Sequence, residues 1–156
     1  MIRKVKQKGW KDVQAEVMNL EDLTFSNDTF THSFASFLLM AVSDPDKVAS
    51  EMHRTLKPGG TAFATISETF GWLYVVHAAQ KVVKPDTPLF RGPVAPEWQT
   101  EARLRSCLEA VGFRIEDIEI KRSTVTAHMK DMVSGMNHFV EAVTMMVAQS
   151  WNSGRE

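Results

Sequence analysis

The sequence has very little cysteine: Cys107 is the only one among 156 residues. One cysteine cannot form a disulfide within the chain, which excludes a disulfide framework and indicates a reducing compartment. It also cannot build a structural zinc site, and the five histidines show no paired ligand spacing. Because Cys107 shares a helical spacing with Leu104 and Leu108, we expect it to be a buried packing residue rather than a nucleophile.

The sequence also lacks long apolar runs and any strong excess of one charge. No apolar stretch is long enough to cross a bilayer, and Met1 leads directly into a charged stretch without a signal-peptide pattern. The formal net charge of −1 argues against a nucleic-acid groove and against an anionic membrane surface. We therefore expect a cytoplasmic protein that binds neither nucleic acid nor membrane.

The sequence does contain alternating strand and helix patterns. Its 44% of hydrophobic residues suffices for the core of one domain, which we expect to span residues 1–156. Short β patterns occupy residues 13–18, 30–36, 61–67 and 115–120, and helical periodicity occupies residues 45–56, 72–83, 100–111 and 129–147. This alternation predicts an α/β fold with a mostly parallel sheet of about four strands flanked by helices.

The boundaries of one helix and one loop are clearly marked. Asp44 can accept hydrogen bonds from the free amides of a helix that begins at Pro45, because proline suits the first helical position. The Lys-Pro-Gly-Gly sequence at residues 57–60 ends that helix, since proline cannot continue it and glycine permits a positive-φ turn. Residues 85–96 contain four prolines and are predicted to form an extended loop.

Three segments, in this order and at this spacing, resemble one enzyme family. They are residues 19–30 (NLEDLTFSNDTF), residues 44–56 with the ending EMHRTL, and residues 56–60 (LKPGG). Together they resemble the class I S-adenosylmethionine-dependent methyltransferases, in the small-molecule group related to ubiquinone biosynthesis. The resemblance covers most of the chain and implies a Rossmann-like fold, in which ligands sit outside the carboxyl ends of the strands.

The resemblance implies S-adenosylmethionine as the cofactor and four residues that bind it. Asn19 stands where the family has an acid that accepts a hydrogen bond from the adenine amino group, and Leu20 matches the residue beside the adenine ring. The asparagine oxygen can accept the same bond without charge assistance. Ser36 and Phe37 match the segment beneath the methionine part of the donor.

The resemblance also implies an acceptor site for a small, apolar metabolite, as in secondary metabolism. The residues at the matching cap are Trp72, Phe90 and Trp98. Methyl transfer depends mainly on the alignment of donor and nucleophile, so a general base is optional. Among the histidines, His77 is the candidate base, because it lies in the predicted helix near that cap.

The chain departs from the family pattern in ways that predict a truncated methyltransferase-like domain. No glycine-rich run and no ribose-binding acid precede Asn19. Two strand–helix units of the family and its last antiparallel strand are missing, which leaves a reduced or incomplete sheet. Because unpaired strand edges are unfavourable when buried and adhesive when exposed, we expect a homodimer, or a partner chain that completes the sheet.

Two classes of function remain open at this point. The first is a methyltransferase that acts on a small metabolite. The second is a non-methylating relative: a pseudoenzyme, a binding or scaffold module, or an isomerase or cyclase that reuses the acceptor pocket. The missing glycine-rich segment favours the second class for the isolated chain, whereas the resemblance favours the first.

Overall fold

The computed structural model describes residues 7–125, which group into two compact units. Within this range the first unit contains residues 7–65 together with residues 105–115, and the second contains residues 66–104 together with residues 116–125. The helix predicted over residues 129–147 lies outside the described residues, and the expected single domain stays a prediction. No helix within the described range is long and apolar enough to cross a membrane.

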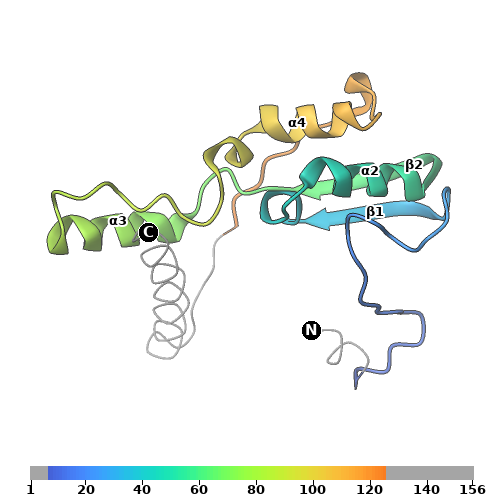
Figure 1. Cartoon of the computed structure of the whole chain (residues 1–156), viewed down its shortest axis with the longest axis horizontal. Coiled ribbons are helices and arrows are strands. Elements are labelled where there is room, and N and C mark those ends of the chain that lie inside the picture. Colours follow the sequence, from blue (N-terminus) through green and yellow to red (C-terminus); the bar gives the residue numbers. More distant parts are fainter. Residues whose placement is uncertain (1–6, 126–156) are drawn as a thin grey trace. The chain divides into compact units, whose positions relative to one another are not determined.

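The first unit is built around a β-α-β crossover. β1 (Phe30–Ser36) and β2 (Leu56–Thr65) pair in parallel, and they are connected by a short 3-10 turn, η1 (Leu39–Ala41), and by α2 (Pro45–Thr55). Figure 1 shows α2 lying along the strands. A parallel pair requires such a crossover, because a tight turn joins only antiparallel strands. The predicted α/β class with a parallel sheet is confirmed, with two strands in residues 7–125 rather than about four.

The buried face of this sheet carries small side chains. The register pairs on this face are Ser33 with Ala62 and Ala35 with Ala64. Side chains of this size let a helix approach closely, and α2 buries Val48, Ala49 and Met52 in the same unit. The core of the first unit therefore lies between the small residues of the sheet and the apolar face of α2.

Aromatic side chains occupy the opposite face of the sheet. Phe34 and Phe63 are register partners, and their rings stack with centroids 4.6 Å apart. The His32 ring extends the row and lies nearly parallel to the Phe63 ring at 6.4 Å. Phe34 is 72% exposed and Phe63 is 45% exposed, so this face is open within the part of the chain that the structure describes.

The boundaries of α2 follow the predicted signals. The Asp44 side chain accepts a hydrogen bond from the Lys47 amide at 3.0 Å, and the helix begins at the next residue, a proline. At its end the Thr55 hydroxyl donates to the Glu51 carbonyl at 2.8 Å. β2 then begins at Leu56, earlier than the predicted start at residue 61, because the backbone becomes extended as soon as the helix ends.

Residues 57–60 form a bulge at the start of β2. β1 pairs Phe30 with Leu56 and then His32 with Thr61, so five steps along β2 match two steps along β1. Gly59 takes a positive φ of 77° within this bulge. The turn predicted from the two glycines is therefore present, and it lies inside a strand rather than between a helix and a strand.

The second unit is built on α3 (Gly71–Val83) and the loop that follows it. The loop runs back along the helix (Figure 1) and leads to a 3-10 turn, η2 (Pro96–Gln99), and to α4 (Glu101–Ala110), which continues into the first unit. The Gln80 side chain holds the loop: its amide donates to Thr87 Oγ1 at 3.1 Å and to the Pro88 carbonyl at 2.7 Å. The predicted helices over 72–83 and 100–111 are confirmed, as is the loop between them.

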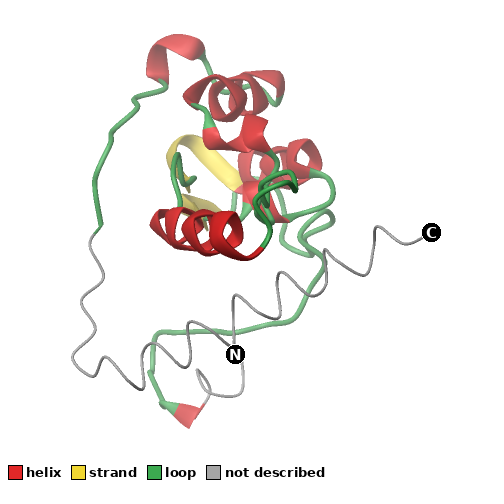
Figure 2. Cartoon of the chain, turned by 90° about the vertical axis from the view of Figure 1, so that its left-hand side faces the viewer, coloured by secondary structure: helices red, strands yellow, loops and turns green. Residues whose placement is uncertain are grey.

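Two of the predicted strands are wrong. Residues 13–18 form a loop, drawn green in Figure 2, and residues 115–120 form a 3-10 turn, η3 (Ile115–Asp117), followed by loop. A strand is stable only when a neighbouring strand satisfies its backbone groups, and in residues 7–125 only β1 and β2 pair with each other. The alternating valines and isoleucines predicted a β tendency, but they could not supply the neighbouring strand.

Candidate functional site

The carboxyl end of β1 carries two of the predicted site residues, Ser36 and Phe37. Phe37 takes a left-handed conformation with a φ of 51°, which disfavours a residue with a side chain by about 1 kcal/mol. Its amide donates to the Thr65 carbonyl and to Thr65 Oγ1, both at 3.1 Å. The end of β2 thus fixes this strained turn, and the Phe37 ring remains 51% exposed.

The other two predicted residues, Asn19 and Leu20, lie in a turn and not at the end of a strand. Asn19 Oδ1 accepts a hydrogen bond from the Glu21 amide at 3.1 Å, and the Asn19 carbonyl accepts one from the Asp22 amide at 3.3 Å. This is the local bonding that favours asparagine in turns. Because an amide oxygen has two lone pairs, Asn19 Oδ1 keeps one acceptor position for a ligand.

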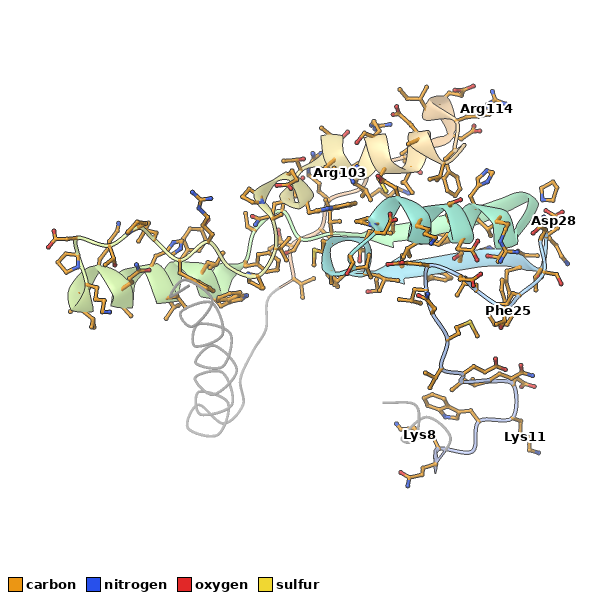
Figure 3. All side chains as sticks on the ribbon, in the orientation of Figure 1. Lys8, Lys11, Phe25, Asp28, Arg103 and Arg114 are labelled. Carbon is orange, nitrogen blue, oxygen red and sulfur yellow. The ribbon has the colours of Figure 1, made fainter. Side chains whose placement is uncertain are left out.

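A side-chain clamp between α2 and the loop before β1 was missed in the sequence. The guanidinium of Arg54 makes five hydrogen bonds: to Glu51 Oε1 and Oε2 at 2.7 Å each, to the Phe25 carbonyl and Asn27 Oδ1 at 2.8 Å each, and to the Leu23 carbonyl at 3.0 Å. Glu51 Oε2 also accepts the Leu23 amide at 2.8 Å. Figure 3 labels Phe25 and Asp28 in this loop, just before β1. The available signal was a glutamate three residues before an arginine on a helix.

The charges of this clamp stabilise each other. The hydrogen bonds from Arg54 lower the pKa of the Glu51 carboxyl below its ordinary 4.5, against the opposing effect of burial, and the Leu23 amide lowers it further. The same contact with Glu51 raises the pKa of Arg54. Because the Glu51 side chain is only 14% exposed, solvent screens this pair less than it screens a surface pair.

We expect Glu51→Gln to lower the free energy of unfolding by about 2 kcal/mol at pH 7, because a neutral amide cannot match the carboxylate's bonds to Arg54. A carboxyl whose folded pKa is depressed stabilises the protein above its unfolded pKa of 4.5 and loses that contribution as the pH falls through the folded pKa. The difference in the free energy of unfolding between wild type and Glu51→Gln should therefore shrink below pH 4.5. Urea unfolding at pH 7, 4.5 and 3.5 measures it.

The matched control is Glu119→Gln. Glu119 pairs with Lys121 at 3.2 Å, but both side chains are largely exposed, and such surface pairs contribute little. Its unfolding midpoint should stay close to that of the wild type at every pH. An equal loss in both variants would contradict a special role for the clamp.

In the second unit, α3 and its loop bring Trp72, His77 and Phe90 together. His77 Nε2 lies 2.7 Å from the Phe90 carbonyl oxygen, and the Trp72 and Phe90 ring centroids are 6.4 Å apart. A carbonyl can only accept, so Nε2 carries the proton and donates it. In the neutral ring Nδ1 is then the nitrogen that can take up a proton.

The remaining predicted acceptor residue, Trp98, is placed differently. It is buried in η2, and the Arg103 guanidinium carbon lies 4.4 Å from its ring centroid. This stacking makes Trp98 a packing residue of the turn that precedes α4.

Cys107 is fully buried, as predicted, with its Sγ 3.8 Å from the Pro45 carbonyl. Across residues 7–125 no three histidine, cysteine, aspartate or glutamate side chains gather in a way that could bind a metal.

Comparison with known proteins gives a consistent set of similarities. A family described as a methyltransferase domain matches residues 1–64. Methyltransferase ucsB from Acremonium sp is 30% identical over 114 residues, which cover 72% of this chain and 38% of that protein. The acetylaranotin bis-thiomethyltransferase of Aspergillus terreus is 24% identical over 143 residues, which cover 84% of this chain and 47% of that protein. The chain spans less than half the length of these curated relatives.

A solved structure is similar in fold. It is a chain of the complex between the Haloferax volcanii Trm112 methyltransferase activator and a protein assigned as a methyltransferase. The match covers 78% of this chain and 54% of that chain, with a TM-score of 0.50 and 21% identity. At this identity the likeness shows the fold alone, and it agrees with a reduced Rossmann-like arrangement.

Proposed function

This chain belongs to the class I S-adenosylmethionine-dependent methyltransferases, and we propose that it forms part of an enzyme that methylates a small, apolar metabolite. S-adenosylmethionine is the cofactor of this family and supplies an activated methyl group. The observation that carries the proposal is the turn after β1. Its exposed Phe37 ring lies at the carboxyl end of a parallel strand, where ligands bind in folds of this type.

The donor residues fit the cofactor in their chemistry. Asn19 Oδ1 retains one acceptor position that suits the adenine amino group, and Leu20 offers an apolar surface beside it. Ser36 and Phe37 would hold the methionine part. The Phe37 amide donates to the Thr65 carbonyl and to Thr65 Oγ1 and so fixes the backbone at this turn, which means that little conformational freedom would be lost on binding.

The acceptor residues fit an apolar substrate. Trp72 and Phe90 provide the aromatic surface of the proposed acceptor site. Trp98 is buried in η2, where it packs in the turn that precedes α4. His77 is the proposed base: the Phe90 carbonyl holds its Nε2 proton, so Nδ1 would take the proton that the acceptor releases. A role in secondary metabolism is supported by the fungal relatives, one of which is an acetylaranotin bis-thiomethyltransferase.

A homodimer, or a partner chain that completes the sheet, remains part of the proposal. The open aromatic face of Phe34 and Phe63 supports it, because stacked rings of this size are normally covered.

Calorimetric titration of the full chain with S-adenosylmethionine tests the donor site, together with the variant Asn19→Asp. We expect micromolar binding by the wild type. In Asn19→Asp the affinity should rise about three- to ten-fold, because a carboxylate accepts the adenine bond with charge assistance. The bond from the Glu21 amide is kept by the new side chain.

Gln14→Glu is the control for the added charge, since residue 14 is exposed in the loop that precedes Asn19. Its affinity for the donor should equal that of the wild type. No heat at millimolar donor would contradict the proposal for this chain. An equal rise in donor affinity in Asn19→Asp and Gln14→Glu would show that the rise comes from the change in net charge and not from the adenine bond.

A further inference from the structure

The loop that leads from Asn19 and Leu20 to β1 is held by side chains of α2. The backbone of the turn closes at Asp22, whose amide bonds to the Asn19 carbonyl, and backbone pairing resumes when the Asp28 amide bonds to the Arg54 carbonyl. Between these points the Leu23 and Phe25 carbonyls and the Leu23 amide bond to the Arg54 and Glu51 side chains. The path of the loop therefore depends on that clamp.

The geometry of the clamp requires an arginine. Its planar guanidinium has five N–H groups in a rigid fork, and the five bonds described for Arg54 involve both sides of that fork. Three of the acceptors come from the loop, and the other two belong to Glu51. A lysine ammonium has three donors at a single point and cannot reach all of these acceptors at once.

Leu23 connects the clamp to the turn that carries the predicted donor residues. It follows directly on the Asn19–Asp22 turn, and both of its backbone polar groups are bound: the amide to Glu51 and the carbonyl to Arg54. A shift of Leu23 would move the exit of the turn. The orientation of Asn19 Oδ1 and of the Leu20 side chain would change with it.

We propose that Arg54, acting with Glu51, is a positioning residue that sets the Asn19–Leu20 turn for binding the adenine end of the donor. This inference rests on the proposed function for the identity of the ligand. It assigns to the Glu51–Arg54 pair a role in donor affinity that acts through the loop at residues 23–27, without contact between Arg54 and the donor.

The experiment compares wild type, Arg54→Lys and Asn27→Ala by amide hydrogen exchange and by calorimetric titration with S-adenosylmethionine and with adenosine. In Arg54→Lys we expect the Glu21, Asp22 and Leu23 amides to exchange at least ten-fold faster, whereas the amides of β1 keep their protection. Affinity should fall at least ten-fold, and by the same factor for both ligands, since the change affects the adenine end. Asn27→Ala removes one acceptor, so it should raise the exchange rates and lower the affinity by smaller factors.

Arg114→Lys is the matched control, because Arg114 lies after α4 and is exposed. It should leave both the exchange rates and the affinities unchanged. Unchanged exchange at Glu21, Asp22 and Leu23 in Arg54→Lys would overturn the inference, as would unchanged donor affinity. If Arg54→Lys does not fold, Asn27→Ala decides by the same two measurements. A wild type that binds no donor refutes the proposed function and the donor role of Arg54, whereas the exchange rates still decide whether the clamp sets the turn.

Discussion

Gly60→Ala is expected to lower the free energy of unfolding by about 2–3 kcal/mol, a large effect for one added methyl group. A Cβ at residue 60 would lie 2.9 Å from the Lys57 carbonyl oxygen and 3.0 Å from the Thr31 carbonyl oxygen. Both contacts are with backbone, which cannot move aside as the end of a side chain can. The bulge at residues 57–60 would have to open, and with it the pairing of β1 to β2 at that point. Urea unfolding followed by circular dichroism measures the loss.

Gly71→Ala is the matched control, because a Cβ at residue 71 would meet no heavy atom within 4 Å. Gly71 begins α3 and has no positive φ, so the change should be neutral or stabilise by up to about 0.5 kcal/mol. Equal midpoints for the two variants would show that the bulge is not as closely packed as the structure indicates.

The contrast between these glycines shows which parts of the fold were predictable. The sequence correctly placed the end of α2 and a turn at residues 57–60, because both depend on local backbone preferences of proline and glycine. It could not distinguish the roles of the two glycines. Gly59 is needed for its φ of 77°, whereas Gly60 is needed because Thr31, on another strand, passes close to it.

The strands were predicted less well than the helices for a similar reason. Cap signals such as Asp44 before a proline act within a few residues, and the helices they predicted are present. The β patterns at residues 13–18 and 115–120 required neighbouring strands, and no local pattern can show whether a neighbour exists. β1 and β2 form a pair because the crossover through α2 places the two strands side by side.

In the candidate site, too, the features that depend on local sequence were predicted and the long-range contacts were not. Ser36 and Phe37 lie at the carboxyl end of β1, as the β pattern over residues 30–36 predicted. The clamp of Arg54 was missed, because two of its acceptors are backbone carbonyls, 29 and 31 residues away in the sequence. Backbone carbonyls are the same at every position, so no residue type could reveal that these two converge on Arg54.

Phe37→Gly is expected to separate donor binding from stability. Glycine relieves the strain at a φ of 51°, which favours the folded state by about 1 kcal/mol, but its greater freedom in the unfolded chain offsets about 0.5–1 kcal/mol of that. Stability should therefore change by less than about 1 kcal/mol. Donor affinity should fall at least ten-fold, because burial of a phenylalanine ring against a ligand contributes about 1.5–3 kcal/mol, and about 1.4 kcal/mol corresponds to a factor of ten.

Asp28→Gly provides a closely matched control. Asp28 is the other described residue with a side chain and a positive φ, at 55°, and it lies just before the opposite end of β1. Its replacement relieves the same kind of strain without touching the proposed donor residues, and glycine keeps the amide that bonds to the Arg54 carbonyl. Stability should respond as in Phe37→Gly, whereas the dissociation constant for S-adenosylmethionine should stay at the wild-type value. Equal affinity in both variants would show that the Phe37 ring does not contact the donor, and its strained backbone would then need another explanation.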